Sequence, residues 1–587
     1  MPGNCGESPG ITEGGQHPPA ARLRERLGWR AALVIFLFGG TLLGIYLGRA
    51  HVLTFHEVIF AEPAREMIRT GDWGMTRFAG IPSTHKPPLT HWLVALSMVT
   101  FHSGAEWVCR LPSMLAAILT AWIVAALAAR YYGRRVGLIC GLVQVSTFYT
   151  MMQARLAEAD MPLCLLVTAA MALFALANVE PAASPRLWPL VQAGFFAACG
   201  LALLTKSVIG PAFIFAGCGL FILIQRQWSS LRFFLSPIGW LVFLAITLPW
   251  PIWAYKVYPP ILHDWLMHTV GRFGGRLGGG SHAGPFYYFY MVPAILLPWT
   301  VWATPGIVAQ VRQGLWRTPQ WRFLFAWAAA GFAILTASAF KSKHYAIPLM
   351  PAFSIVAAWC VDREAFIRLN RFRLRPLYAG LLVGAACVLV PVIVQRTQPT
   401  MWPQAAIVAT AVGLPIWVAL WFDYRKRPVA TLVCLFAVFW TAGVAVQVLF
   451  MPALDTYRAY TELAREVNAL APPEVPVYLV DLPEDQITYY LRFPLTRIDD
   501  VAVFEETVKG RTDSVFYIMT TGQAADWLST IGSITALSPP VRRSKRDPFS
   551  PAFTARVFLK FTPAGPGVNP SVPPNESIKP PTPRPLY

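Results

Sequence analysis

The feature that most constrains the fold is a series of apolar runs of about 17 to 24 residues, which recur from residue 31 to residue 452. An α-helix rises 1.5 Å per residue, so a run of this length matches the hydrocarbon core of a bilayer. The sequence therefore predicts an α-helical polytopic membrane protein with about 13 transmembrane helices. The expected spans are residues 31–49, 110–129, 136–152, 161–178, 188–205, 208–224, 233–254, 285–305, 321–339, 345–361, 375–394, 403–422 and 429–452.

The distribution of charge orients these helices. The chain carries 49 Lys and Arg against 30 Asp and Glu, a net charge of +19. Basic residues gather in short loops between the apolar runs, such as 130–135, 363–375 and 425–427, and Lys and Arg mark the cytoplasmic side of a membrane. Topology thus explains the net charge, which excludes a nucleic-acid-binding interpretation. The remaining loops are expected on the extracytoplasmic side.

The sequence divides into four parts. Residues 1–30 are expected to be a disordered cytoplasmic N-terminus, followed by a first span that acts as a signal anchor, and residues 31–452 form the transmembrane module. Segments such as VPVYLVDL and DSVFYIM indicate strands, so residues 453–562 are expected to form a small soluble α/β domain. An odd number of spans places this domain outside. The proline-rich residues 563–587 are expected to be a disordered tail.

The most unusual loop is the stretch 51–89, within the predicted catalytic outer loop 50–109. It is expected to hold a short amphipathic helix at AEPAREMIR and a second surface helix that begins at Pro88. Ionisable groups beside a bilayer cost free energy unless they meet a partner or a wet cavity, so this loop is a candidate functional site. The alternative is an ordinary solvated loop. Its ionisable residues include His56, Glu57, Glu62, Arg65, Glu66, Asp72, His85 and Lys86.

Other polar residues recur on the same predicted face. Carboxylates beside a ring of cations suit a phosphate-bearing substrate, because Lys and Arg neutralise phosphate oxygens and a carboxylate or His takes a proton from a hydroxyl. A long apolar body would hold a lipid tail. The sequence therefore predicts an enzyme that acts on a lipid-linked phosphate. These further residues are Arg155, Glu158, Asp160, Lys206, Arg272, His282, Lys341, Lys343 and Tyr345.

The outer loop resembles a known family. HEVIFAEPAREM followed by THKPPL is similar to the first outer loop of the polyprenyl-phosphate-dependent glycosyltransferases of the GT-C type. The resemblance is to the lipid A aminoarabinose transferases and the bacterial relatives of protein O-mannosyltransferases, and it covers residues 30–355. Further matches follow in order: RLAEADMP (155–162), LLTKSVIGP (203–211), VGRFGG (270–275), HAGPFYYF (282–289) and KSKHYAIPLMP (341–351).

The resemblance implies transfer of a sugar from a polyprenyl (undecaprenyl-type) monophosphate to a lipid, glycan or protein acceptor, with inversion at the anomeric carbon. It implies a multi-pass protein of the cell (inner) membrane with an extracytoplasmic site. Lys86 would bind the carrier phosphate, and Asp160 would be a second carboxylate of the site. The expected co-ligands and pocket residues are Arg272, Tyr345, Lys206 and His282, and the expected supporting residues are His85, Arg65, Glu158 and Lys343.

Two positions depart from the family pattern. The family's Asp, its presumed base, falls on His56, and the Glu before the lysine falls on His85. The base is then His56, since imidazole titrates near neutral pH, or Glu57. Alternatively the two histidines bind a divalent metal together, or catalysis is altered or lost. No cofactor is otherwise expected, because the nine cysteines lie mostly in apolar runs and none has CxxC spacing.

Two other classes of function are open. A transporter or flippase of lipid-linked substrates usually carries its charges near the bilayer midplane and often shows internal repeats. Here the charges lie at one face and no repeat is evident, which favours the enzyme. A membrane scaffold with a partner-binding outer domain would not need Lys86, Asp160 and Lys206 on one side.

Overall fold

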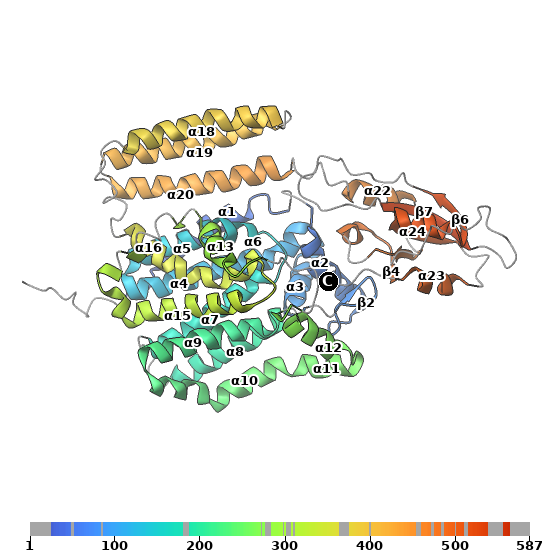
Figure 1. The fold of residues 1–587 in the computed structure, drawn as a ribbon, viewed down its shortest axis with the longest axis horizontal. Helices are drawn as coiled ribbons and strands as arrows, with labels where there is room; N and C mark the ends of the chain where they lie inside the picture. Colours follow the sequence, from blue (N-terminus) through green and yellow to red (C-terminus); the bar gives the residue numbers. More distant parts are fainter. Residues whose placement is uncertain are drawn as a thin grey trace, which may run out of the picture.

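The protein is described by a computed structural model, in which a helical bundle occupies one end and a mixed sheet the other (Figure 1). The predicted tails fall largely on residues 1–24 and 564–587, outside the described residues. The structure describes residues 25–48, 52–83, 86–179, 187–271, 273–275, 283–297, 299–300, 307–308, 311–362, 375–397, 401–425, 427–452, 460–470, 475–482, 486–498, 500–509, 515–537 and 556–563.

The bundle confirms a multi-pass helical membrane protein. Among the described residues, seven helices are long and apolar enough to cross a membrane, and four shorter apolar helices accompany them. The long ones are Glu106–Tyr132, Asp160–Asn178, Trp188–Lys206, Pro237–Val257, Lys343–Asp362, Trp402–Tyr424 and Val429–Leu449. The helices of the bundle are α1 (Trp29–Gly44), α4 (Glu106–Tyr132), α5 (Arg134–Ser146), α6 (Phe148–Gln153), α7 (Asp160–Asn178), α8 (Trp188–Lys206), α9 (Ile209–Gln225), α10 (Pro237–Thr247), α11 (Pro249–Val257), α12 (Ile261–Leu266), α13 (Tyr287–Ile295), α15 (Pro319–Ala337), α16 (Met350–Asp362), α18 (Arg375–Thr397), α19 (Trp402–Tyr424) and α20 (Pro428–Ala445).

Two predicted spans are interrupted. The run 136–152 is divided between α5 and α6, whose junction residue Thr147 has extended backbone. The run 233–254 is divided between α10 and α11 at Leu248, because Pro249 follows and proline lacks the N–H that would continue the ladder. The hydrophobicity of the sequence predicts the two apolar runs, but it does not predict where each run is divided between two helices.

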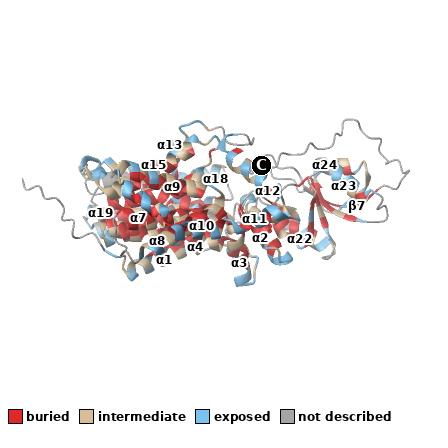
Figure 2. Cartoon of the chain, turned by 90° about the horizontal axis from the view of Figure 1, so that it is seen from below, coloured by how far each residue is buried: buried red, intermediate tan, exposed pale blue. Residues whose placement is uncertain are grey.

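Buried residues concentrate where α4, α7 and α8 pack together (Figure 2). Phe174 lies at the centre of an aromatic cluster with Phe221, Phe233 and Phe323. Small residues allow close helix contact: a Cβ at Gly137 of α5 would lie 2.7 Å from the carbonyl oxygen of Ala125 of α4. The outermost helices α18 and α19 instead expose apolar side chains, as lipid contact requires.

The outer loop folds onto the end of the bundle. Helix α2 (Phe55–Thr70) begins with a capping box, in which Thr54 and Glu57 exchange hydrogen bonds, and ends at Gly71, whose φ of 74° suits glycine. This helix is longer than the predicted AEPAREMIR helix, because the capping box starts it at Phe55 and Pro63 lies inside it. A short hairpin follows, β1 (Arg77–Phe78) and β2 (Ile81–Pro82), and then α3 (Leu89–Phe101).

Residues 460–563 hold a five-stranded mixed sheet with the order β4-β3-β5-β7-β6. Strand β3 is parallel to β4 and β5, whereas β7 is antiparallel to β5 and β6. The elements are α22 (Tyr460–Leu470), β3 (Val477–Val480), β4 (Leu495–Ile498), α23 (Val501–Val508), β5 (Phe516–Thr521), α24 (Gly522–Leu528), β6 (Gly532–Ala536) and β7 (Arg556–Pro563).

This sheet region is docked on α2 and on the start of α4. Arg65 of α2 donates hydrogen bonds to the carbonyl oxygens of Thr488 (3.1 Å), Tyr489 (2.6 Å) and Leu491 (3.3 Å). The hydroxyl of Tyr490 accepts from the backbone N–H of Leu53 at 2.8 Å. A hydrophobic cluster shared by both regions, including Val58, Val94, Leu479 and Ile487, lies beneath these contacts. Arg65, predicted to support the site, therefore joins α2 to the C-terminal region.

Replacing Arg65 by Ala is expected to loosen this docking without unfolding the bundle. The change leaves buried carbonyls without donors, at a cost of about 2 kcal/mol. Limited proteolysis should then release the C-terminal region faster than in the wild type. Arg69→Ala is the matched control, since Arg69 is half exposed and its nitrogen lies 3.9 Å from Glu66. Equal proteolysis rates for both variants would contradict the assignment.

Candidate functional site

The centre of the site is an ion pair between the ends of two spanning helices. Nζ of Lys206 lies 2.6 Å from Oδ1 of Asp160, and the two side chains are 11% and 6% exposed. Asp160 occupies the first turn of α7 and Lys206 the last turn of α8. Each charge thus lies at the helix end whose dipole favours it. The pair is therefore nearly buried and shielded from water.

Aromatic and basic side chains surround this pair. Nζ of Lys206 lies 4.8 Å from the ring centroid of Tyr345, a half-buried residue of the short 3₁₀ helix Lys343–Leu349. The ring of His344 packs edge-on against Tyr345 at 4.7 Å. His344 also lies within electrostatic range of Asp160, Lys206, His56 and Lys86. Five segments far apart in sequence therefore meet here.

His344 was not predicted as a site residue. Its Nδ1 lies 2.9 Å from the hydroxyl of Ser342, which orients the ring. The available signal was its position in the KSKHY segment, between the nominated Lys343 and Tyr345. Lys343 itself is exposed, and its Nζ lies 5.8 Å from the ring of Tyr149.

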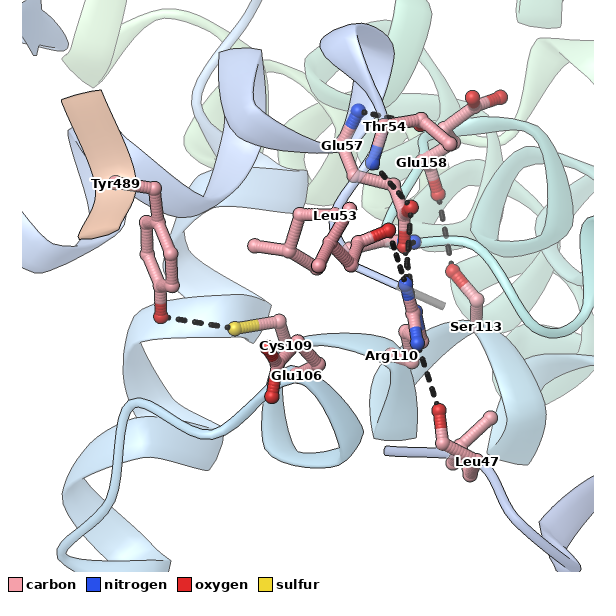
Figure 3. Close-up of polar contacts among 12 residues, drawn as sticks. Leu47, Leu53, Thr54, Glu57, Glu106, Cys109, Arg110, Ser113, Glu158 and Tyr489 are labelled. Atoms are coloured by element: carbon pink, nitrogen blue, oxygen red, sulfur yellow. Dashed lines mark hydrogen bonds and ion pairs between the residues drawn. The ribbon is translucent and has the colours of Figure 1, made fainter. Parts of the chain in front are cut away.

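Glu57 has a different environment from His56. Figure 3 shows its carboxylate facing Arg110, with Oε1 accepting from Nε of Arg110 at 2.7 Å and from the backbone N–H of Ala157 at 3.1 Å. Oε2 accepts from the backbone N–H of Thr54 at 2.8 Å and from the second guanidinium nitrogen at 3.2 Å. Glu57 has no exposed surface, whereas His56 is exposed. This environment fits a structural carboxylate better than the predicted base.

Arg110 extends this network to the preceding chain. It donates to the carbonyl oxygens of Leu47 (2.8 Å) and Val52 (3.3 Å), and it is itself fully buried. The guanidinium thus fixes the segment that leads from α1 into α2. No sequence pattern indicates this role, since Arg110 is the first residue of a predicted span.

Glu158 is the second carboxylate close to Asp160. It is 8% exposed and lies between α6 and α7, where its carbonyl oxygen accepts from the hydroxyl of Ser113 at 3.1 Å. Burial, followed by the negative charges of Asp160 and Glu57, raises the pKa of Glu158 to about 8. A carboxyl that holds its proton near neutral pH is characteristic of sites of proton transfer.

Other nominated residues have structural roles or lie outside the description. Lys341 donates to the carbonyl oxygens of Thr336 (2.8 Å) and Ser338 (2.7 Å), and so closes the end of α15. His85, Arg272 and His282 fall outside the described residues. Within the described ranges, no group of three or more His, Cys, Asp and Glu could hold a metal ion. The predicted His56–His85 metal pair therefore stays a prediction.

Comparison with known proteins places this geometry in context. Residues 85–253 match the model of the dolichyl-phosphate-mannose-protein mannosyltransferase family. The chain is 29% identical over 363 residues to the undecaprenyl phosphate-alpha-4-amino-4-deoxy-L-arabinose arabinosyl transferase of Shewanella sediminis, covering 60% of this chain and 63% of the relative. It is 28% identical over 332 residues to the enzyme of that name from Edwardsiella ictaluri, covering 56% of this chain and 58% of the relative.

The fold is shared more widely than the sequence. The crystal structure of ArnT from Cupriavidus metallidurans bound to undecaprenyl phosphate has a TM-score of 0.73 and 20% identity, covering 91% of this chain and 98% of that one. The apo form of the same protein matches equally well, at 21% identity. By sequence, the chain spans about three fifths of the length of the relatives it matches. In sequence the chain thus resembles the aminoarabinose transferases and the dolichyl-phosphate-mannose-protein mannosyltransferase family, and it shares its fold with ArnT.

Proposed function

We propose that this chain is an integral-membrane glycosyltransferase that moves a sugar from a polyprenyl monophosphate carrier to an acceptor at the extracytoplasmic face of the inner membrane. The observation that carries the proposal is that Lys86, Lys206, Asp160 and His344 lie near one another, with Asp160 and Lys206 paired at the ends of α7 and α8. The predicted topology of about 13 spans, with residues 453–562 as an extracytoplasmic α/β domain, is part of the proposal. It fits the docking of that region on α2.

The cations have a defined role in this reaction. As the bond between the anomeric carbon and the phosphate oxygen breaks, negative charge grows on the departing phosphate. Lys86 would neutralise that charge, since an ammonium beside a phosphate oxygen is most effective where water is scarce. Arg272, Tyr345 and His282 remain the predicted co-ligands. Lys206 would serve as the second cation, held in place by Asp160 and Tyr345.

Two of the carboxylates at the site are already paired with cations. Asp160 is already engaged by Lys206, and Glu57 by Arg110. His56 is exposed on α2, the side from which an acceptor would approach. His85 and a divalent metal shared with His56 remain open predictions.

Lipid analysis tests this function. In cells that lack the gene, one polyprenyl-phosphate sugar should accumulate, and the purified full-length protein should convert that species to polyprenyl phosphate. Lys86→Ala should slow this conversion by at least about 100-fold. Lys256→Ala is the control, since Lys256 is an exposed cation at the last turn of α11. If the protein moves the accumulated lipid across a vesicle membrane without releasing polyprenyl phosphate, it is a transporter and the proposal is wrong.

A further inference from the structure

Glu158 is the titratable group whose position the proposed reaction leaves unexplained. Its backbone is fixed on both sides: its N–H donates to the carbonyl oxygen of Leu156 at 2.9 Å, and its carbonyl accepts from Ser113. Two residues later α7 begins at Asp160. The side chain is therefore held at the same helix end as the central ion pair.

The carboxylate of Glu158 has no partner within the described residues. The two acidic side chains that act on it both have one: Glu57 pairs with Arg110 and Asp160 pairs with Lys206. Figure 3 shows the carboxylate of Glu158 directed away from the network of Glu57 and Arg110. Neither oxygen is among the fully enclosed polar atoms without a partner, so the little surface that Glu158 exposes includes its carboxylate.

Charges from every adjoining element act on this group. Asp160 of α7 and Glu57 of α2 favour its protonated form, and the phenol of Tyr149 on α6 also lies within electrostatic range. Lys206 of α8 and Lys86 before α3 favour its ionised form. Burial outweighs both cations, so the pKa of Glu158 rises to about 8. A nearly buried carboxylate with this affinity for a proton and no fixed partner is suited to receive one.

We propose that Glu158 is the carboxylate that accepts the proton of an attacking hydroxyl, so that the acceptor is a hydroxyl group and not a phosphate. This inference rests on the proposed glycosyl transfer. An acceptor phosphate is already anionic near neutral pH and has little need of a base, whereas an alcohol must lose its proton as it attacks. The site therefore carries a group that only a hydroxyl acceptor requires.

The acceptor oxygen forms a bond to the anomeric carbon while its proton passes to the carboxylate of Glu158. The bond from that carbon to the phosphate oxygen breaks, and its electron pair stays on the polyprenyl phosphate, beside Lys86. The proton afterwards leaves Glu158 to water, which restores the carboxylate for the next turnover.

The pH profile of the purified full-length protein tests this assignment. The substrates are the donor that accumulates on deletion and a glycolipid extract of the same deletion cells. Glu158 acts as a base only when ionised, so kcat/KM should rise about tenfold per pH unit below about pH 8 and level off above it. Glu158→Gln should lose that rise and at least about 100-fold of the rate at pH 8.5. Glu158→Asp should keep a rise, with a changed midpoint.

A control variant and a binding assay separate loss of the base from loss of the fold. Asp72→Asn is the control, because the same Oδ1 can still accept from the N–H groups of Gly74 and Met75 at the outer loop. Binding of undecaprenyl phosphate, measured by the change in tryptophan fluorescence, reports whether each variant is folded. If Glu158→Gln does not bind this lipid, the pH profile of Glu158→Asp tests the role of Glu158: a shifted midpoint of kcat/KM supports it, and an unchanged midpoint contradicts it.

The failures are distinguishable. A wild-type profile in Glu158→Gln would overturn the role of Glu158 and leave glycosyl transfer intact. Transfer to a phosphate with a flat profile in the wild type would overturn the hydroxyl acceptor. If the wild type consumes no polyprenyl-phosphate sugar at any pH, the proposed function itself is wrong.

Discussion

Arg110→Ala is expected to destabilise the protein by about 3–5 kcal/mol, the cost of leaving a buried charge without its partner. Arg110 and Glu57 are both fully buried and are joined at 2.7 Å. The variant would strand the carboxylate of Glu57 and two backbone carbonyls at Leu47 and Val52. Since these groups define the passage from α1 into α2, the position of His56 would be lost with them.

Thermal unfolding of the detergent-solubilised protein measures this effect. Arg69→Ala, which removes an exposed guanidinium from the same helix as Glu57, should change stability by less than about 1 kcal/mol. The double variant Arg110→Ala/Glu57→Ala should be destabilised less than the sum of the two single variants, because they share one interaction. Strict additivity would show that the two residues act independently.

Lys206→Met is expected to lower kcat/KM for the donor by about 100- to 1,000-fold. The change removes a cation from the site and leaves Asp160 as an uncompensated negative charge 2.6 Å from the former ammonium. A carrier phosphate would then meet repulsion where it should meet attraction. Lys206→Arg should retain more activity, since the guanidinium keeps the charge.

Steady-state kinetics and equilibrium binding of undecaprenyl phosphate check this result. The double variant Lys206→Met/Asp160→Asn should bind the lipid more tightly than Lys206→Met alone, since it removes the stranded carboxylate. Lys256→Met, at an exposed position of α11, serves as the control. If the wild type, Lys206→Met, the double variant and Lys256→Met all bind undecaprenyl phosphate equally well, Lys206 does not belong to the carrier site.

Much of the bundle could be predicted because an apolar run of bilayer length has few other solutions. The same reasoning joined Asp160, Lys206 and Tyr345 as residues of one face, and the structure brings them together. Long-range pairing could not be predicted. Arg110 and Glu57 are 53 positions apart, and Arg65 meets the carbonyl of Tyr489 across 424 positions. Neither pair leaves a periodic signal, because a contact between distant segments depends on packing and not on local spacing.

The shared hydrophobic cluster and the hydrogen bonds of Arg65 also constrain protein engineering. A chimaera that takes residues 460–563 from a relative would inherit new side chains opposite α2, the helix on which His56 sits. The grafted backbone would have to place the carbonyl oxygens that Arg65 binds at Thr488 and Tyr489, and the graft would have to keep an aromatic hydroxyl within reach of Leu53. Any graft that changes residues 460–563 must therefore be designed together with α2, because the two share one hydrophobic cluster and the hydrogen bonds of Arg65.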